Sequence, residues 1–161
     1  MRIPRVWEQN DEHIQVSVGS VFYAHTLSDV RPANITSMMA NLDAFVRESE
    51  GLVGCLFHVV AGAVPPSSHD RARTTEMFNR HATRLSGVAV VIEAIFPSAL
   101  LRSAVTMVFD MTRREFDTRT FEDVVPASEW LAPKQAMSAS EIVTTAAEAR
   151  AALSEGRAPR W

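Results

Sequence analysis

The chain has 161 residues, of which 47% are hydrophobic and 22% charged, and these values fit one globular domain and exclude a chain that is disordered throughout. A formal net charge of −3 provides no basic field for nucleic acid, so we expect no nucleic-acid partner. No stretch reaches the roughly 18 uninterrupted apolar residues of a membrane span, and residues 1–11 lack the apolar core of a secretory signal. We therefore expect a cytoplasmic protein without a membrane span.

The first elements in the chain are predicted to be strands. In His13–Val18 every second residue is apolar, as a half-buried strand requires, and Val21–Thr26 continues as a second strand. The turn signal at residues 19–20 indicates a hairpin between them, and a short strand over residues 5–8 precedes it. Residues 35–50 carry apolar side chains at three- and four-residue steps, which predicts an amphipathic helix.

Two apolar runs, residues 53–60 and 87–96, dominate the middle of the chain. Both are rich in strand-forming residues, a pattern typical of strands that are covered on both faces. A helix beginning at Ser67 or Ser68 separates them, and another helix over residues 97–113 follows. Strands alternating with helices predict an α/β fold with a parallel or mixed sheet, with the two runs side by side at its centre.

The C-terminal part adds a short strand over residues 115–121 and a short helix over 126–131. Residues 138–156 are rich in alanine and begin with capping-box spacing, which predicts a further helix. We divide the chain into an α/β domain, residues 1–135, and a C-terminal alanine-rich helix and tail, residues 136–161. The apolar side of this helix is narrow, so it docks either on the domain or on a partner.

The element order resembles the STAS (anti-sigma-factor-antagonist-like) family and its lipid-binding SEC14-like neighbours. The resemblance is carried by the apolar strand at 88–94, the helix at 98–109, the short strand at 116–123 and Ser128-Glu-Trp-Leu, and it covers roughly residues 5–132. It implies a STAS-like mixed sheet with helices, followed here by the C-terminal helix. It also implies a bacterial regulatory protein that acts through contacts with other proteins.

STAS-type antagonists are phosphorylated on a serine or threonine in a loop before the second helix. The corresponding stretch here, residues 64–69, contains Ser67 and Ser68 but lacks the aspartate and glycine of the family pattern. The resemblance implies phosphorylation of one of these serines, and the N-terminus of a helix favours the added charge. The residues by themselves favour helix N-capping.

The helix over 97–113 is more apolar than packing on one sheet requires. Leu101, Val105 and Phe109 are therefore candidates for an apolar partner interface. Two interpretations remain open. These side chains contact a second copy of the chain in a homodimer, or the C-terminal helix of the same chain covers them.

No catalytic, cofactor or metal-binding motif is present. The five histidines lack zinc-site spacing, and there is no phosphate loop or Gly-x-Ser-x-Gly elbow. The single cysteine, Cys55, is predicted to be a buried apolar residue. His58 is predicted to be a hydrogen-bonded core histidine that faces away from Cys55, because three steps along a strand reverse the side chain.

These observations favour a non-enzymatic STAS-like interaction module, homodimeric and without cofactor or metal. The alternative is a small apolar-ligand or lipid carrier of SEC14-like type, for which the seven methionines would suit an adaptable pocket. A third hypothesis is an enzyme whose site brings His25, His58 and Arg102 together from distant positions. Whether His25 and His58 meet on adjacent strands is a question for the fold.

Overall fold

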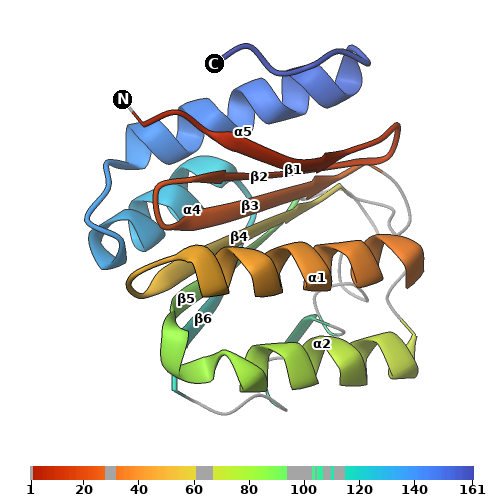
Figure 1. The fold of residues 1–161 in the computed structure, drawn as a ribbon, viewed down its shortest axis with the longest axis vertical. Coiled ribbons are helices and arrows are strands. Elements are labelled where there is room, and N and C mark those ends of the chain that lie inside the picture. Colours follow the sequence, from red (N-terminus) through yellow and green to blue (C-terminus); the bar gives the residue numbers. More distant parts are fainter. Residues whose placement is uncertain are drawn as a thin grey trace.

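The computed structural model describes residues 2–27, 32–60, 67–93, 103, 105, 106, 110 and 115–161. Within them, one six-stranded sheet lies between two layers of helices (Figure 1). The strands are β1 (Arg5–Gln9), β2 (His13–Val18), β3 (Val21–Thr26), β4 (Val53–Val59), β5 (Leu85–Ile92) and β6 (Asp117–Phe121). The helices are α1 (Pro32–Glu48), α2 (Ser68–Arg80), α4 (Val124–Leu131) and α5 (Ala139–Ser154), with short 3₁₀ turns η1 (Ala82–Arg84) and η2 (Ala132–Lys134).

The sheet is mixed and its strands follow chain order from β1 to β6. β1 to β3 are antiparallel neighbours, which confirms the predicted hairpin, and β3 to β6 run parallel. The predicted fold class is therefore confirmed: an α/β mixed sheet with helices and a C-terminal helix, consistent with a STAS-like arrangement. The two apolar runs form β4 and β5, which pair directly at the centre of the parallel part.

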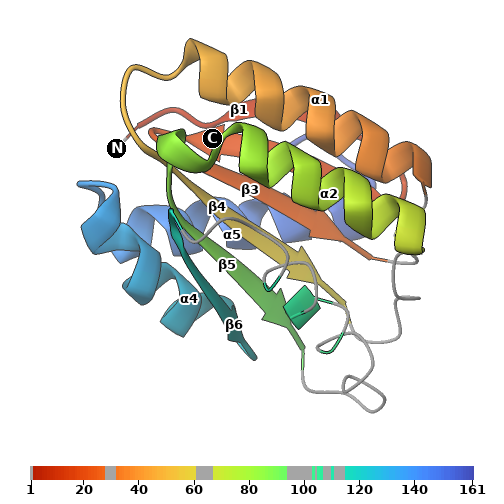
Figure 2. The ribbon, with the colours of Figure 1, turned by 90° about the horizontal axis from the view of Figure 1, so that it is seen from below.

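Side-chain alternation along the strands divides the core into two clusters. The first cluster, with Tyr23, Leu56 and Val91, lies under α4 and α5. The second cluster, with Phe22 and Cys55 among its members, lies under α1 and α2, which run side by side on the opposite face (Figure 2). Cys55 is fully buried, as predicted, and burial raises the pKa of its thiol, so it is held in the unreactive protonated form.

The C-terminal helix α5 packs on its own domain. The Ser138 side chain and Glu141 form the predicted capping box, and the apolar side of the helix is buried against the first cluster. That buried side consists of Ile142, Ala146, Ala149 and Leu153. Between them the two helix layers cover both faces of the central strands, as the apolar composition of β4 and β5 requires. In the part of the chain that the structure describes, no helix has the length and apolarity to cross a membrane.

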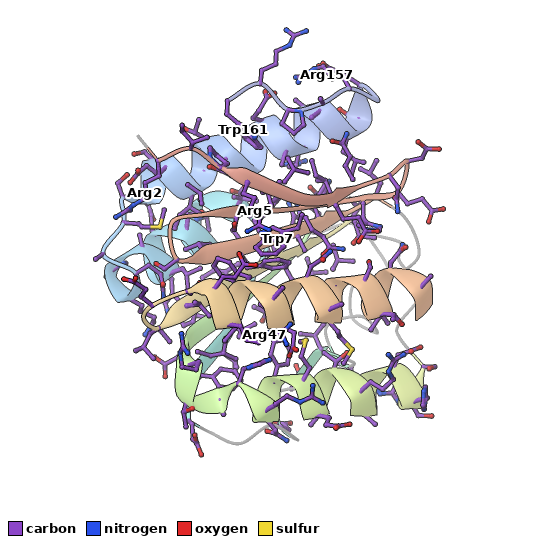
Figure 3. The ribbon with its side chains drawn as sticks, in the orientation of Figure 1. Arg2, Arg5, Trp7, Arg47, Arg157 and Trp161 are labelled. Atoms are coloured by element: carbon purple, nitrogen blue, oxygen red, sulfur yellow. The ribbon has the colours of Figure 1, made fainter. Side chains whose placement is uncertain are left out.

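The edge strand β1 contains a β-bulge, and the extra residue contacts α1. The register with β2 shifts between Val6 and Glu8, so one extra residue, Trp7, is accommodated there. The Trp7 ring packs edge-on against Phe45 of α1 and donates from Nε1 to Ser17 Oγ at 2.9 Å. Figure 3 shows Arg5 and Trp7 together on the α1 side of this edge. The bulge also directs Glu8 toward α1, where it joins a buried polar network.

Candidate functional site

Polar side chains gather where the central parallel strands end. His25 lies near the end of β3, His58 near the end of β4, and Glu93 directly follows β5. His25 and His58 are direct partners in the β3–β4 register, and their ring centroids are 4.5 Å apart. The fold therefore does bring the two histidines together. In open α/β sheets, ligands bind at these carboxyl ends of the strands, which makes the cluster the candidate site.

A chain of hydrogen bonds connects this site to the core below it and to α5 above it. The Tyr23 hydroxyl lies 3.2 Å from His58 Nδ1, and His58 Nε2 lies 3.0 Å from Glu93 Oε1. The same carboxylate oxygen accepts a hydrogen bond from an Arg150 guanidinium nitrogen at 3.0 Å. His58 is thus a hydrogen-bonded core histidine, as predicted, and α5 contributes Arg150 to the rim of the site.

The protonation states in this chain follow from burial. Tyr23 is almost fully buried, and burial raises its pKa far above the usual value, so its hydroxyl keeps its proton and donates to His58 Nδ1. His58 then carries its own proton on Nε2 and donates to the Glu93 carboxylate. Burial and the Arg150 charge lower the pKa of His58 to about 4. Both ring nitrogens of His58 are therefore satisfied in the neutral form.

His25 differs from His58 because one ring nitrogen has no partner. The side chain is 1% exposed, and among the described residues its Nδ1 makes no hydrogen bond. Burial, together with the neighbouring His58 and Arg150, lowers the pKa of His25 to about 3, while a hydrogen bond to the His58 backbone opposes the shift. That bond engages the other nitrogen as a donor, so Nδ1 is a buried lone pair that is free to accept a hydrogen bond.

Sequence reasoning identified the two histidines but missed the other members of the cluster. Tyr23 shares a strand face with His25 at a spacing of two residues, a signal that was available. Glu93 lies at the end of an apolar run, and Arg150 lies on the polar side of an alanine-rich helix. Neither position indicates a role in this site unless the fold is known. Arg102, the third member of the hypothetical enzyme site, lies outside the described residues.

The cluster holds no evident metal site. Searched over its described residues, the chain has no group of three or more His, Cys, Asp or Glu side chains placed to hold an ion. The arrangement offers other chemistry instead: a neutral imidazole acceptor, a carboxylate held by two donors, and a guanidinium with a half-exposed side chain. Such a set binds polar molecules through hydrogen bonds and charge.

The two serines of the predicted phosphorylation site lie at the start of α2, exposed to solvent. Ser67 is the N-cap: its Oγ accepts from the Asp70 backbone nitrogen at 3.1 Å and donates to the Asp70 carboxylate at 2.6 Å. Ser68 is the first residue of the helix. The N-capping interpretation is thus confirmed for Ser67, and modification of either serine stays a prediction.

The predicted partner interface falls mostly outside the described residues, because Leu101 and Phe109 are not among them. Val105 is partly buried and packs against the second core cluster, next to α1 and α2. Helix α5 packs against the first cluster, on the other face of the sheet. At Val105, therefore, the contacts are with the domain core rather than with the C-terminal helix.

A second polar network lies on the opposite face, under α1. Asn41 Nδ2 donates to Gln15 Oε1 at 3.0 Å and to Glu8 Oε2 at 3.2 Å, and Gln15 Nε2 donates to Ser37 Oγ at 3.2 Å. Beside it, His13 Nε2 lies 3.1 Å from Glu8 Oε1. A cavity of about 20 Å³ adjoins this network, which is room for a single water molecule.

Comparison with known proteins gives no relative from which the function of this site can be inferred. No protein-family model, curated protein or solved structure matches the chain. The class that the fold defines is that of α/β proteins with a mixed sheet, and the role of the chain has to be inferred from its own residues.

Proposed function

We propose that the chain is a non-enzymatic regulatory module of STAS-like type that acts through protein contacts, as a homodimer. The observation that carries the proposal is that Ser67 and Ser68 are exposed at the start of α2, and that later turns of the same helix, from Arg73 on, line an open groove shared with α1. A modifiable helix start and a groove on the same helix would together provide a contact that phosphorylation can switch.

The groove has the composition of a protein-binding surface. It encloses about 320 Å³, with the partly buried Met39 between charged side chains of both signs and with Met77, which is 1% exposed and belongs to the second core cluster, at its base. Its walls are joined across the two helices, by Arg73 donating to Thr36 at 3.2 Å and by His81 bonding Asp43 at 2.5 Å. The flexible Met39 side chain can adapt to different partners, while the charged rim gives orientation.

The cap geometry distinguishes the two serines as modification sites. A phosphate on Ser67 would remove the hydroxyl proton now donated to Asp70 and place two like charges together, because Asp70 is only 4% exposed. A phosphate on Ser68 keeps this cap and adds its charge at the helix N-terminus, where the helix dipole stabilises it. Ser68 is therefore the favoured site.

The homodimer is tested by size-exclusion chromatography with light scattering at micromolar concentration. We expect a dimer that Phe109→Asp converts to a monomer, because a charge disrupts an apolar contact. The matched control is Val125→Asp, which places the same charge on the exposed apolar side chain of α4 and leaves the dimer intact. A wild-type monomer, or a dimer unaffected by Phe109→Asp, contradicts the proposed interface.

The regulatory contact is tested by mass spectrometry of the protein isolated from its own cells. We expect phosphate on Ser68, absent in Ser68→Ala. Protein that carries no phosphate at Ser67 or Ser68 under any growth condition contradicts the switch. The lipid-carrier alternative stays a prediction. The cavity beside His13 has room for one water only, and the larger open hollows, at residues 9–11 with 153–158 and between α1 and α2, are lined mostly by polar and charged residues.

A further inference from the structure

We propose that β6 is the edge of the sheet through which two copies of the chain pair, in an antiparallel register centred on Thr118. Such pairing joins two sheets into one continuous sheet, which is how an exposed edge strand recruits a second strand. The inference rests on the proposed homodimer and names a surface that forms it. In the chain, β6 follows the helix predicted over residues 97–113, which carries the candidate apolar interface.

The outer edge of β6 is open to solvent. The strand pairs with β5 on one side, and among the described residues its backbone makes no hydrogen bond to any other element. Figure 2 shows β6 at the margin of the sheet, with α4 over one face. Asp117, Arg119 and Thr120 are exposed, so no other part of the chain covers them. The outward N–H and C=O groups of β6 are therefore available to a second strand.

The two edges of the sheet differ in their protection against such pairing. At the other edge, the β-bulge of β1 interrupts the ladder between Val6 and Glu8, and bulges block edge-to-edge pairing. β6 has an unbroken register with β5 and contains no proline. Its threonines, Thr118 and Thr120, favour the extended conformation. Of the two edges, β6 is therefore the one suited to accept another strand.

The charges on β6 are complementary to those of a second β6 and fix the register. Asp117 and Arg119 are two residues apart and lie on the same face of the strand. About a twofold axis at Thr118, Asp117 of each copy lies opposite the partner's Arg119, which gives two opposite-charge pairs. An axis at Asp117 or at Arg119 places two like charges opposite each other instead. Although Asp117 already pairs with Lys134 at 2.5 Å, its side chain is 67% exposed and open to a second cation.

Disulfide cross-linking of the full chain tests the register. Opposite residues of antiparallel strands have Cα atoms about 4.5–5.5 Å apart, within the span of a disulfide. Thr118→Cys should therefore give a covalent dimer under mild oxidation. The matched control is Thr120→Cys, whose two copies lie about 13 Å apart along the strands and should not cross-link. The wild-type chain should not cross-link either, because its single cysteine, Cys55, is fully buried.

Charge reversal tests the proposed pairs by sedimentation equilibrium. Arg119→Asp turns both opposite-charge pairs into like-charge pairs, so we expect the dissociation constant of the dimer to rise about tenfold. Adding Asp117→Arg should restore most of the affinity, because each pair is then reversed rather than lost. The control Arg47→Asp reverses an exposed charge on α1 and should leave the dissociation constant unchanged.

The outcomes separate this inference from the proposed function. A dimer that Thr118→Cys does not cross-link, or that Arg119→Asp does not weaken, overturns the inference and leaves the homodimer in place. Cross-linking by Thr120→Cys instead of Thr118→Cys overturns the register. A dimer that cross-links at position 118 but is unaffected by Phe109→Asp supports the inference and contradicts only the apolar interface. A wild-type monomer overturns both the homodimer and the inference, and leaves the modification of Ser68 as a separate question.

Discussion

The two faces of the sheet differ in how they accommodate buried polar side chains. Each buries a histidine with at least one ring nitrogen that makes no hydrogen bond among the described residues: Nδ1 of His25 under α4 and α5, and both ring nitrogens of His13 under α1. Under α1, the surrounding polar groups are largely amides and hydroxyls that satisfy one another, as in the Gln15–Asn41 pair. Near His25, they form a relay of ionisable groups that ends at the partly exposed Glu93 and Arg150.

This difference indicates which face of the sheet carries the candidate functional site. The network around Gln15 consists mainly of amides and hydroxyls, with the Glu8 carboxylate at its edge beside His13, and it fixes the position of α1. The adjoining cavity of about 20 Å³ holds at most a water. A relay of Tyr, His, Glu and Arg costs more to bury, since each ionisable group must be paired or neutralised. Perturbed pKa values in such a cluster are typical of functional sites. The His25–His58 cluster is therefore the candidate functional site among the described residues, and the Gln15 network positions α1.

The largest expected effect is a pH dependence that originates from the His25–His58 cluster. Both imidazoles are neutral in the fold, with pKa values of about 3 and 4 against 6.5 ordinarily. At pH values between the folded and unfolded pKa, the unfolded chain binds more protons than the folded chain. The stability that the two neutral histidines contribute is therefore complete above pH 6.5 and is lost as the pH falls toward 4. Urea unfolding at pH 7 and pH 5 should show a loss of about 3 kcal/mol. A free energy of unfolding that stays constant over this window argues against buried neutral histidines.

The second prediction concerns the Gln15 network. Gln15→Leu keeps the approximate volume of the side chain but removes its hydrogen bonds to Asn41 and Ser37, which keep their contacts with Glu8 and the Asn34 carbonyl. We expect the free energy of unfolding to fall by about 2 kcal/mol, which is about 1 kcal/mol for each of the two lost hydrogen bonds. The pH dependence between 7 and 5 should be unchanged, because the two neutral imidazoles lie on the other face. A variant that alters that slope would show that the two faces are coupled.

The smallest effect is expected from Tyr23→Phe, which removes one hydroxyl from the relay and keeps the ring in the core. Loss of the hydrogen bond to His58 Nδ1 should destabilise the protein by about 1 kcal/mol. Because the donor that held the neutral form is gone, the His58 pKa should rise, which NMR titration of the ring measures. An unchanged His58 pKa would mean that the Tyr23 hydroxyl does not set the tautomer.

Several parts of the fold were predictable because they depend on local patterns. Alternation identified β2, the turn signal after it identified β3, the apolar runs identified β4 and β5, and capping-box spacing identified the start of α5. The boundary of β5 was predicted two residues late, at 87, because η1 leads directly into an extended Leu85 without a sequence signal. The candidate site was only half predictable, since Glu93 and Arg150 lie 57 residues apart in the chain and meet only through packing.

The amino-acid sequence by itself determined the class of the protein: its periodicities dictate which segments form strands and which helices, and two central strands composed almost entirely of apolar residues must be covered on both faces. Only the tertiary structure decided which side chains form the candidate functional site. The parallel register of β3 and β4 places His25 beside His58, and the docking of α5 brings Arg150 to Glu93. The physical reason is that periodicity is a local property of the chain, whereas strand register and helix docking are set by contacts between segments distant in sequence.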